Sequence, residues 1–471
     1  MRRVLVLGAG PAGLAAARAA RSRGAQVTLV DSADAVGGQY WRHLPEARAG
    51  AREEVLHHGW GRFAAMREQL SQDTDVRILT STQVWAIDRS AEGTLRVHAF
   101  EGPVDGPGRQ PHTLTAESII FATGAHDRSL PFPGWTLPGV VTAGAAQALA
   151  KSERVAIGRR VVVAGAGPFL LPVAASLSQV GAGVVGVFEA ATLANLASGW
   201  LPKPWGLARA SHKMGELTEY VTGQVRHRIP YHLGQGVVAA HGDGRVEAVT
   251  IADLDANWAP KPGSERTIEA DSLCVSHGFV PRVELAIAAG CRLRPDRFVE
   301  VDDSLRTSVP GVYAAGELTG IGGIDSSLVE GEIAGLAAAS NDPIPAALQR
   351  RHRATDDFTA RLESAHGIRR GWTEWLTDET IICRCESVSA GTIRRTAEAS
   401  AQDALRSVKL TTRAGLGICQ GRMCGRTVEE LIGAHPESGR TDARPIAAPV
   451  RIAELAQTIT NQEHQREGNT Q

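Results

Sequence analysis

Cysteine is rare in this chain, and its few copies are unevenly placed. Six of the 471 residues are cysteines, and four of these lie between positions 383 and 424. A secreted protein that depends on disulfides would carry more cysteines, spread along its whole length. The pattern therefore excludes a disulfide framework and predicts a reducing compartment, the cytoplasm.

Net charge and long hydrophobic runs are also missing. Lysine and arginine number 50, and aspartate and glutamate number 51, which argues against nucleic acid or an anionic membrane as a partner. The apolar segment 161–177 is interrupted by glycine and proline and is shorter than the ~20 residues that span a bilayer. We expect about three folded, soluble domains that could contact a membrane only through partners.

Glycine is abundant, and two glycine-rich segments repeat one another. The chain has 51 glycines, and VLVLGAGPAGLAAA near the N-terminus is echoed by VVVAGAGPFLLPVA from Val161. Each segment passes from aliphatic residues through a glycine turn into an alanine- and leucine-rich stretch, which predicts strand, turn and helix. We therefore expect two nucleotide-binding folds in one chain.

The first glycine turn has the full pattern of a dinucleotide site. Gly8, Gly10 and Gly13 form G-x-G-x-x-G directly after the expected strand 4–7, so backbone amides at the helix start can face a pyrophosphate. The next strand ends at Asp31, where a carboxylate is expected to bind a ribose hydroxyl. Further strands are expected at 76–87, 95–100, 117–124, 271–278 and 311–316.

The second glycine turn departs from this pattern. Gly165 and Gly167 repeat the first two glycines, but Leu170 stands at the third position. Glu189, at the end of the next expected strand, could bind a ribose, and its charge would favour NAD over NADP. Two alternatives stay open: a bound NAD or other adenine nucleotide, and an empty structural domain.

The clustered cysteines form the most specific chemical pattern of the chain. Cys383-x-Cys385 is followed, after 33 residues, by Cys419-x4-Cys424. Two close pairs of thiolates suit a [2Fe-2S] cluster, whose two irons each take two thiolates. Structural zinc and a disulfide are less favoured alternatives, because zinc more often uses C-x2-C pairs and the compartment is reducing. Segments 387–400 and 427–432 predict helices of a small cluster module.

Several segments together resemble the two-dinucleotide-binding-domain flavoproteins. They are the first glycine turn, Gly37-Gly38-Gln39, ATG at 122–124 and GVYAAGE at 311–317. The resemblance implies an α/β fold in which FAD lies in the first of two nested Rossmann-like domains. It implies FAD contacts from Gly8, Gly10, Pro11, Ala12, Gly13, Asp31, Gly38, Gln39, Val84, Thr123, Gly124, Gly316 and Glu317. The family usually has aspartate where Glu317 stands. Its disulfide reductases carry a cysteine pair beside the flavin, and the absence of any cysteine before Cys274 excludes that activity.

The segments CRCESVS and KLTTRAGLGICQGRMC resemble the bacterioferritin-associated-ferredoxin-like [2Fe-2S] domain at all four cysteines. With PFPGWTLPGVVTAGAAQ at 131–147 and AGELTGIGG at 315–323, the chain is similar to the large subunit of multi-subunit amine dehydrogenases. That group includes the large subunits of opine oxidases, of D-hydroxyproline dehydrogenase and of hydrogen cyanide synthase. The resemblance implies an FAD domain at 1–135 and 270–345, a second nucleotide domain at 136–269, a helical linker at 346–380, the cluster domain at 381–435 and a tail at 436–471.

The resemblance also implies an electron-relay role. In that group a separate FAD subunit, resembling glycine and D-amino-acid oxidases, oxidises a C–N bond of an amino acid, imino acid or opine. The large subunit then moves electrons between FAD and the cluster, and a small ferredoxin-like [2Fe-2S] subunit is a second candidate partner. A stand-alone NADH-dependent reductase and a scaffold with vestigial sites are the alternatives.

No motif in the chain indicates an acid–base pair that could act on a substrate. The sequence therefore leaves the catalytic residues of the chain unidentified. His126 and His277 are the titratable groups expected nearest the flavin, although core roles are favoured for both. Cys274 and Cys291 are expected in the core, and the segment WLPKPW at 200–205 is a candidate partner-contact surface.

Overall fold

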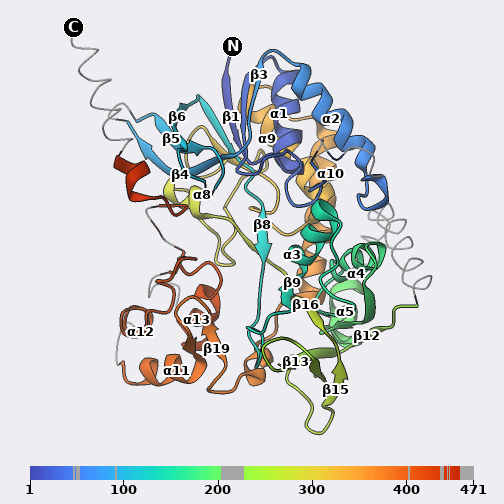
Figure 1. The fold of residues 1–471 in the computed structure, drawn as a ribbon. Helices are drawn as coiled ribbons and strands as arrows, with labels where there is room; N and C mark the ends of the chain where they lie inside the picture. The colour runs from blue at the N-terminus through green and yellow to red at the C-terminus, as the bar shows by residue number, and fades with distance from the viewer. Residues whose placement is uncertain are drawn as a thin grey trace.

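The computed structural model describes residues 1–45, 48, 53–90, 93–104, 106–202, 228–400, 404–434, 440–442, 444 and 446–456. Its two α/β parts each have a five-stranded parallel sheet, and a small helical module lies beside them (Figure 1). The predicted α/β architecture with two Rossmann-like parts and a small helical module is confirmed. Residues 457–471 of the predicted tail and the second half of WLPKPW, residues 203–205, lie outside the described residues.

The first sheet has the order β18-β7-β1-β2-β3. Its strands are β1 (Arg3–Leu7), β2 (Gln26–Val30), β3 (Val76–Leu79), β7 (Ser118–Phe121) and β18 (Val312–Ala314). Alternate side chains of β1 enter two different cores, because successive residues of a strand point to opposite faces. Val4 and Val6 pack with α1 (Pro11–Ser22), α2 (Trp60–Gln72) and α9 (Gly323–Ala339). Leu5 and Leu7 pack with a second, antiparallel sheet.

That antiparallel sheet consists of β4 (Thr82–Arg89), β5 (Leu95–Glu101) and β6 (Gln110–Thr115). The single strand predicted over 76–87 is therefore wrong, because the chain breaks into β3 and β4 around Ser81. Ser81 has a φ of +48°, which turns the chain out of the first sheet. Because the chain breaks here, β3 and β4 belong to two different sheets. Leu7, at the end of β1, packs in the core between these two sheets.

The second large sheet has the order β12-β11-β10-β16-β9. Its strands are β9 (Val140–Thr142), β10 (Arg160–Gly165), β11 (Gly183–Glu189), β12 (Tyr231–Leu233) and β16 (Ser272–Ser276). Around it lie α3 (Ala143–Ala148), a π-helical turn (Leu149–Glu153), α4 (Leu170–Gln179), α5 (Leu193–Trp200) and the antiparallel β13 (Gln235–His241), β14 (Ala248–Asp253) and β15 (Arg266–Glu269).

Two short strands carry the chain between the large sheets. β8 (Ala125–Asp127) leads out of the first part after β7, and β17 (Phe279–Pro281) leads back after β16. They pair antiparallel, with His126 opposite Val280, and α8 (Glu284–Ala288) follows. The second part is thus inserted into the first, as the resemblance implies.

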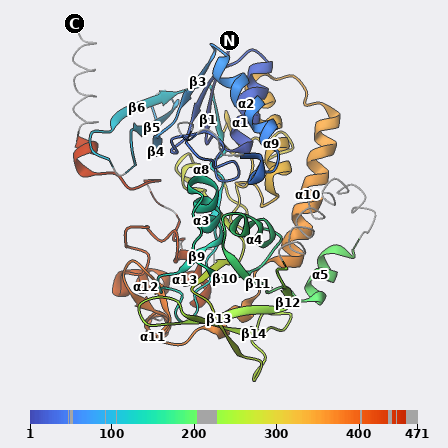
Figure 2. The ribbon, with the colours of Figure 1, turned by 45° about the vertical axis from the view of Figure 1, so that its right-hand side comes forward.

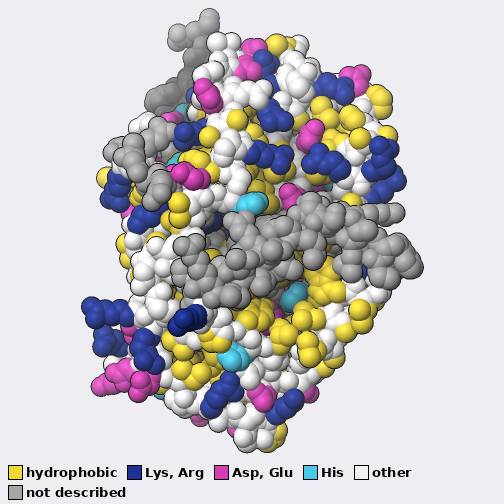
Figure 3. Space-filling model, turned by 90° about the vertical axis from the view of Figure 1, so that its right-hand side faces the viewer, with side chains coloured by type: hydrophobic (Ala, Val, Ile, Leu, Met, Phe, Trp, Pro, Cys, Tyr) yellow, Lys and Arg dark blue, Asp and Glu magenta, His cyan; other side chains and the backbone are white. Residues whose placement is uncertain are grey.

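One long helix spans both parts. α10 (Ala346–His366) runs from beside α9 of the first part to α5 of the second (Figure 2). Its 21 residues correspond to about 32 Å at 1.5 Å per residue. On the face that carries α2 and α10, lysine and arginine side chains lie in the upper half and again at the lower left (Figure 3).

The cysteine module packs against the second part. It contains β19 (Ile381–Cys383), β20 (Val388–Ser389), α11 (Ala390–Glu398), α12 (Ala404–Thr412) and α13 (Gly425–Leu431), after a 3-10 turn (Arg370–Trp375). Trp258, Trp372 and Trp375 form one buried core with Cys383 and Cys424 of the module. The two helices predicted beside the cysteines are confirmed as α11 and α13.

Part of the segment predicted as a tail packs on the first part. Arg109 on the β5–β6 turn pairs with Glu454 at 2.6 Å, and both side chains are nearly inaccessible to water. The N–H of Ala447 donates to the carbonyl oxygen of Trp85. The described part of the chain contains no helix with the length and apolar character needed to cross a bilayer.

Candidate functional site at the two glycine turns and the cysteine quartet

The first glycine turn is shaped by close backbone contacts on one side and open space on the other. A Cβ on Gly13 would lie 1.7 Å from the oxygen of Gly8, and one on Gly8 would lie 2.2 Å from that of Ala122. Gly10 faces the opposite way, and a Cβ there would meet nothing nearer than the Cα of Gly38 at 3.8 Å. The turn thus packs tightly on the sheet and leaves a hollow above the start of α1, whose first N–H groups have no partner within the helix.

Asp31 lies beside this hollow at the end of β2. Its carboxylate accepts hydrogen bonds from the N–H groups of Ala9 at 2.6 Å and Ala33 at 2.8 Å. Burial raises the pKa of Asp31, while these bonds and the charges of Arg282 and Arg42 act to lower it. The carboxylate therefore connects the first glycine turn to the end of β2, where a ribose is predicted to bind.

A large cavity, about 2770 Å³, extends from this turn. Its volume exceeds the 300–1,000 Å³ of an ordinary small-molecule pocket. Thirteen of the predicted site residues line it: Gly8, Gly10, Pro11, Ala12, Asp31, Gly38, Gln39, Val84, Thr123, Gly124, Glu317, Gly167 and Cys419. The structure thus brings parts of both glycine turns and one predicted metal ligand to one cavity. The other predicted site residues do not line it: Gly13, Gly316, Gly165, Glu189, Cys383, Cys385 and Cys424.

Glu330, which the sequence analysis missed, supports the segment after β18. Its carboxylate on α9 accepts hydrogen bonds from the N–H of Gly316 at 2.8 Å and from the hydroxyls of Thr319 and Ser326. Burial, then the charges of Asp127 and Glu330, raise the pKa of the neighbouring Glu317 to about 7. Glu317 therefore faces the cavity as a carboxyl that is partly protonated near neutral pH.

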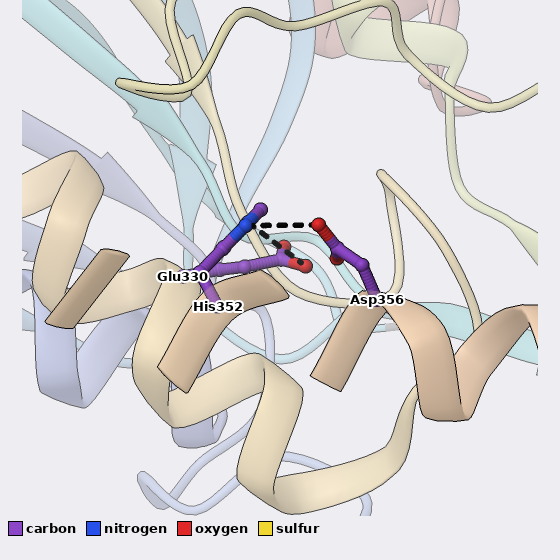
Figure 4. A group of neighbouring side chains, drawn as sticks. All are labelled: Glu330, His352 and Asp356. Carbon is purple, nitrogen blue, oxygen red and sulfur yellow. Dashed lines mark ion pairs between the residues drawn. The ribbon is translucent and has the colours of Figure 1, made fainter. Parts of the chain in front are cut away.

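His352 lies between two carboxylates from two helices (Figure 4). Its Nδ1 lies 2.9 Å from Asp356 on α10, and its Nε2 lies 3.9 Å from Glu330 on α9. Burial acts to lower the pKa of His352, but the hydrogen bond and charge of Asp356 and the charge of Glu330 outweigh it and raise the pKa. The imidazole thus links α10 to the carboxylate that holds Gly316.

The second glycine turn differs from the first in what surrounds its acid. Glu189 is fully buried and accepts hydrogen bonds from the N–H groups of Gly167 and Ala191 and from the hydroxyl of Tyr231. His366, the last residue of α10, lies 3.5 Å away. Tyr231 and His366, and not Glu189, line the cavity. A ribose could reach Glu189 only if these two side chains moved.

Leu170 fills the third position of this turn with a core side chain. It opens α4 and is completely buried among Val161, Val163 and Val173. Gly165 keeps the close approach of its counterpart Gly8, since a Cβ there would lie 1.6 Å from the oxygen of Ser276. The strand–turn–helix geometry is therefore kept, with the Leu170 side chain in the core behind the turn.

His126 and His277 both line the cavity. Burial, then the charges of Arg282, Arg426 and Arg422, lower the pKa of His126 to about 4. Burial and Arg128 lower the pKa of His277 to about 3, and its ring packs against Trp375. Both histidines are thus neutral at pH 7. His277 is buried, as the predicted core role requires, whereas His126 is half-buried at the cavity wall.

The cavity also contains a buried lysine that no sequence pattern indicated. Lys151 lies in the π-helical turn after α3, and its ammonium donates to the carbonyl oxygen of Tyr40 at 3.0 Å. Burial lowers its pKa to about 8. The hydrogen bond from Lys151 to Tyr40 joins the second part of the fold to the segment that follows Gly38.

The four clustered cysteines meet in two pairs. Cys383 lies beside Cys424, which lowers the pKa of Cys383, and Cys385 lies beside Cys419. A tetrahedral zinc site would bring all four sulfurs within about 3.8 Å of one another, given Zn–S bonds of ~2.3 Å. Among the described residues, no three of these sulfurs lie mutually within 4.8 Å. Two separated pairs suit two irons better than one zinc.

Cys274 and Cys291 are separate from this quartet. Both are buried, in different cores, and burial raises the pKa of each thiol. The core roles predicted for them are therefore supported, and neither thiol is placed to act with the other.

Comparison with known proteins accounts for both halves of this site. Residues 2–341 match the family model described as pyridine nucleotide-disulphide oxidoreductase. The chain belongs to this family. Residues 381–434 match the BFD-like [2Fe-2S] binding domain. The protein is thus an oxidoreductase of the pyridine nucleotide-disulphide oxidoreductase family that uses FAD and a [2Fe-2S] cluster.

Relatives of similar length place the chain in the expected group of large subunits. It is 32% identical to the HcnB subunit of hydrogen cyanide synthase from Pseudomonas aeruginosa, over 90% of each chain. It is 31% identical to the A subunit of opine oxidase from Rhizobium meliloti, over 96% of this chain and 87% of the other. The resemblance to large subunits of multi-subunit oxidoreductases is therefore confirmed.

Solved structures confirm the fold. The L-proline dehydrogenase from P. horikoshii superposes with a TM-score of 0.63 at 19% identity, covering 96% of this chain and 79% of the other. The T. acidophilum thioredoxin reductase superposes with a TM-score of 0.51 at 25% identity over 72% of this chain and 99% of the other.

The residues of the first site fit the FAD of this family. The hollow above Gly10 would accept a pyrophosphate against the N-terminus of α1, and Asp31 would hold the ribose. Gly38, with a φ of +61°, approaches the Cα of Gly10 so closely that a Cβ would lie 2.7 Å from it. These close approaches keep the wall of the hollow free of side chains.

Proposed function

We propose that this chain is the electron-relay subunit of a heteromeric dehydrogenase or oxidase that acts on the C–N bond of an amino acid, imino acid or opine. One observation carries the proposal: the cavity that begins at the first glycine turn also reaches Cys419. FAD accepts electrons in pairs and passes them on singly, whereas a [2Fe-2S] cluster takes one at a time. The cavity therefore extends from the proposed FAD site to one of the four proposed cluster ligands.

The proposal assigns these residues the following roles. Gly8, Gly10, Gly13 and Asp31 bind the dinucleotide, and Glu330 fixes the segment Gly316–Glu317 beside it. The ligands of the cluster are Cys383, Cys385, Cys419 and Cys424. His126 and His277, whose pKa values are lowered, contribute uncharged side chains to the cavity wall.

The substrate is oxidised elsewhere, on a partner protein that resembles glycine or D-amino-acid oxidases. Two acids of the cavity wall, Asp127 and Glu330, are occupied by hydrogen bonds within this chain, which supports that division. Asp127 accepts a hydrogen bond from the N–H of Gly144 at 3.0 Å and another from Ser276. Glu330 is held by Gly316, Thr319 and Ser326. Neither carboxylate is free to remove a proton from an amine.

The covered position of Glu189 argues against a stand-alone NADH-dependent reductase. Its carboxylate lies beneath Tyr231 and His366, so NADH would need to displace both to reach the acid that recognises its ribose. The second part then serves as a structural domain that supplies Lys151 and α3 to the cavity wall.

The test uses the purified chain with its FAD and cluster under anaerobic conditions. Amino acids, imino acids and opines are added with and without the co-expressed oxidase-like partner, while flavin absorbance and the electron paramagnetic resonance (EPR) signal of the reduced cluster are followed. We expect both signals to change only when the partner is present. Rapid bleaching by NADH alone would establish the reductase instead, and a colourless protein without sulfide would indicate a scaffold.

A further inference from the structure

Helix α3 and the π-helical turn after it form a wall of the cavity where the two parts of the fold meet (Figure 2). On the inner side, Ala143 and Ala146 pack in the core of the second sheet. Five residues of α3 and the turn line the cavity: Gly144, Ala145, Gln147, Ala148 and Lys151. Gln147 and Lys151 are the polar ones among them, and their spacing of four residues places them on one face.

The ammonium of Lys151 is a buried positive charge without a carboxylate partner among the described residues. Lys151 is 5% exposed, and burial lowers its pKa to about 8, so it is mostly charged at pH 7. One N–H donates to the carbonyl oxygen of Tyr40, whose ring centre lies 5.3 Å from the ammonium. Arg154, which donates to the carbonyl oxygen of Lys151, takes up the charge of Glu53.

The remaining two N–H groups of Lys151 donate to no described residue. A buried charge costs free energy unless hydrogen bonds and an opposite charge meet it. The one titratable neighbour whose pKa its charge lowers is His57, which burial keeps neutral. Lys151 therefore fits a ligand in the cavity that carries negative charge and accepts hydrogen bonds.

Gln147 offers a second polar group one helical turn before Lys151. It is 7% exposed, and its amide makes no hydrogen bond with the described part of the chain. A buried amide without a partner is unfavourable, so a ligand that accepts from it would gain affinity. The other cavity-lining residues of α3 are glycine and alanine, which leave room for a flat group beside these two donors.

Both ends of α3 and its turn lie against segments of the FAD site. At the start, the N–H of Gly144 donates to Asp127, whose charge acts to raise the pKa of Glu317. At the other end, Lys151 donates to the carbonyl oxygen two residues after Gly38. From Gly144 to Lys151 the chain rises roughly 10 Å at 1.5 Å per residue. This length is comparable with the long axis of a three-ring flavin.

We propose that Lys151 is the counter-charge for the reduced flavin ring of FAD, with Gln147 as a neutral hydrogen-bond donor to the same ring. Two electrons, from the amine in the relay or from dithionite in the test, and one proton from water convert the neutral ring into an anion. A fixed ammonium beside the ring attracts this anion more strongly than the neutral oxidised form. Lys151 thus raises the flavin potential and forms no bond with the cofactor. The inference needs FAD in the first site and does not depend on electron transfer to the cluster.

The test measures the two-electron potential of FAD in the purified chain by anaerobic dithionite titration against a reference dye. Lys151→Met removes the charge and keeps a long, unbranched side chain. We expect the preference of the site for reduced over oxidised FAD to fall about tenfold, which lowers the potential by ~30 mV for a two-electron couple. Lys151→Gln, a second neutral side chain, should lower the potential in the same direction.

Two control variants separate charge from other effects. Gln147→Leu removes a neutral donor from the same face, so it should change the potential less than Lys151→Met. Lys261→Met removes a lysine from the exposed loop between β14 and β15, outside the cavity, and should leave the potential unchanged. Fluorescence titration of each apoprotein with oxidised FAD gives the affinity for the oxidised form separately.

An unchanged potential in both neutral Lys151 variants would overturn the proposal. An equal loss of affinity for oxidised and reduced FAD would also overturn it, because the ammonium would then serve a constant charge such as the pyrophosphate. Failure of the relay function has a different signature. In that case the variants would still shift the flavin potential, but amine and partner would not reduce the flavin of the unmodified chain.

Discussion

The carboxylate of Glu330 on α9 accepts a hydrogen bond from the backbone N–H of Gly316, 2.8 Å away at the end of β18. Because the same carboxylate also accepts from Thr319 and Ser326, it fixes the segment that presents Glu317 to the cavity. A glutamine here would replace one acceptor by a donor and leave a buried N–H or hydroxyl without its partner.

We therefore expect Glu330→Gln to lower the free energy of unfolding by about 1–3 kcal/mol and to weaken FAD retention. Urea unfolding and the flavin content after dialysis measure these effects. Glu332→Gln on the same helix is the matched control, because Glu332 has no part in this network. Equal stability of the two variants would show that the Glu330 bonds contribute nothing.

His352 predicts a pH dependence with a definite sign. Its folded-state pKa is raised, so its contribution to stability is complete below its unfolded pKa of ~6.5 and is lost as pH rises through the folded value. We expect the wild-type chain to lose more unfolding free energy than His352→Gln on going from pH 6 to alkaline pH. Parallel pH profiles of the two proteins would contradict this assignment.

Asp31 predicts a specific loss of flavin binding. Asp31→Asn keeps the size of the side chain but replaces one acceptor oxygen by an amide donor, next to the N–H of Ala9 or Ala33. We expect the dissociation constant for FAD to rise at least about tenfold, equivalent to ~1.4 kcal/mol. Fluorescence titration of the apoprotein measures it, with Asp34→Asn, an exposed neighbour, as the control.

The cysteine quartet predicts a loss of iron and sulfide on substitution. Cys385→Ser removes an exposed ligand and should abolish the cluster's EPR signal while FAD stays bound. Cys291→Ser is the control, because its sulfur already lies 3.5 Å from the hydroxyl of Thr307 and a serine can keep that contact. Full iron and sulfide content in Cys385→Ser would remove this residue from the ligand set.

The first site could be predicted from the sequence because its residues lie close together along the chain. Gly8 to Asp31 form one strand–helix–strand unit, so helix length alone sets where the carboxylate arrives. The C-x-C and C-x4-C spacing also indicated the four cysteines. It did not indicate their partners, because the structure places Cys383 beside Cys424 and Cys385 beside Cys419, across the two motifs.

The rest of the site depends on contacts between distant segments. Tyr231 and His366 cover Glu189 from 42 and 177 residues further along the chain, and no local pattern indicates either one. The sequence did not indicate Glu330, because an acidic residue inside a predicted helix is expected to be exposed to solvent. Its burial becomes apparent only when α9 is packed against β18. The sequence did not predict the break at Ser81, because the residues on both sides favour strands. A serine with a positive φ cannot be told from any other serine in the sequence.

Helix α10 constrains how the two nucleotide folds can move. Near its start it is tied through His352 to Glu330, and at its last residue His366 lies over Glu189. A rotation of one nucleotide fold relative to the other about the β8–β17 strand pair would have to bend α10 or break its contacts at one end. In the relay that we propose, α10 would hold the two nucleotide folds at one separation while electrons move between FAD and the cluster.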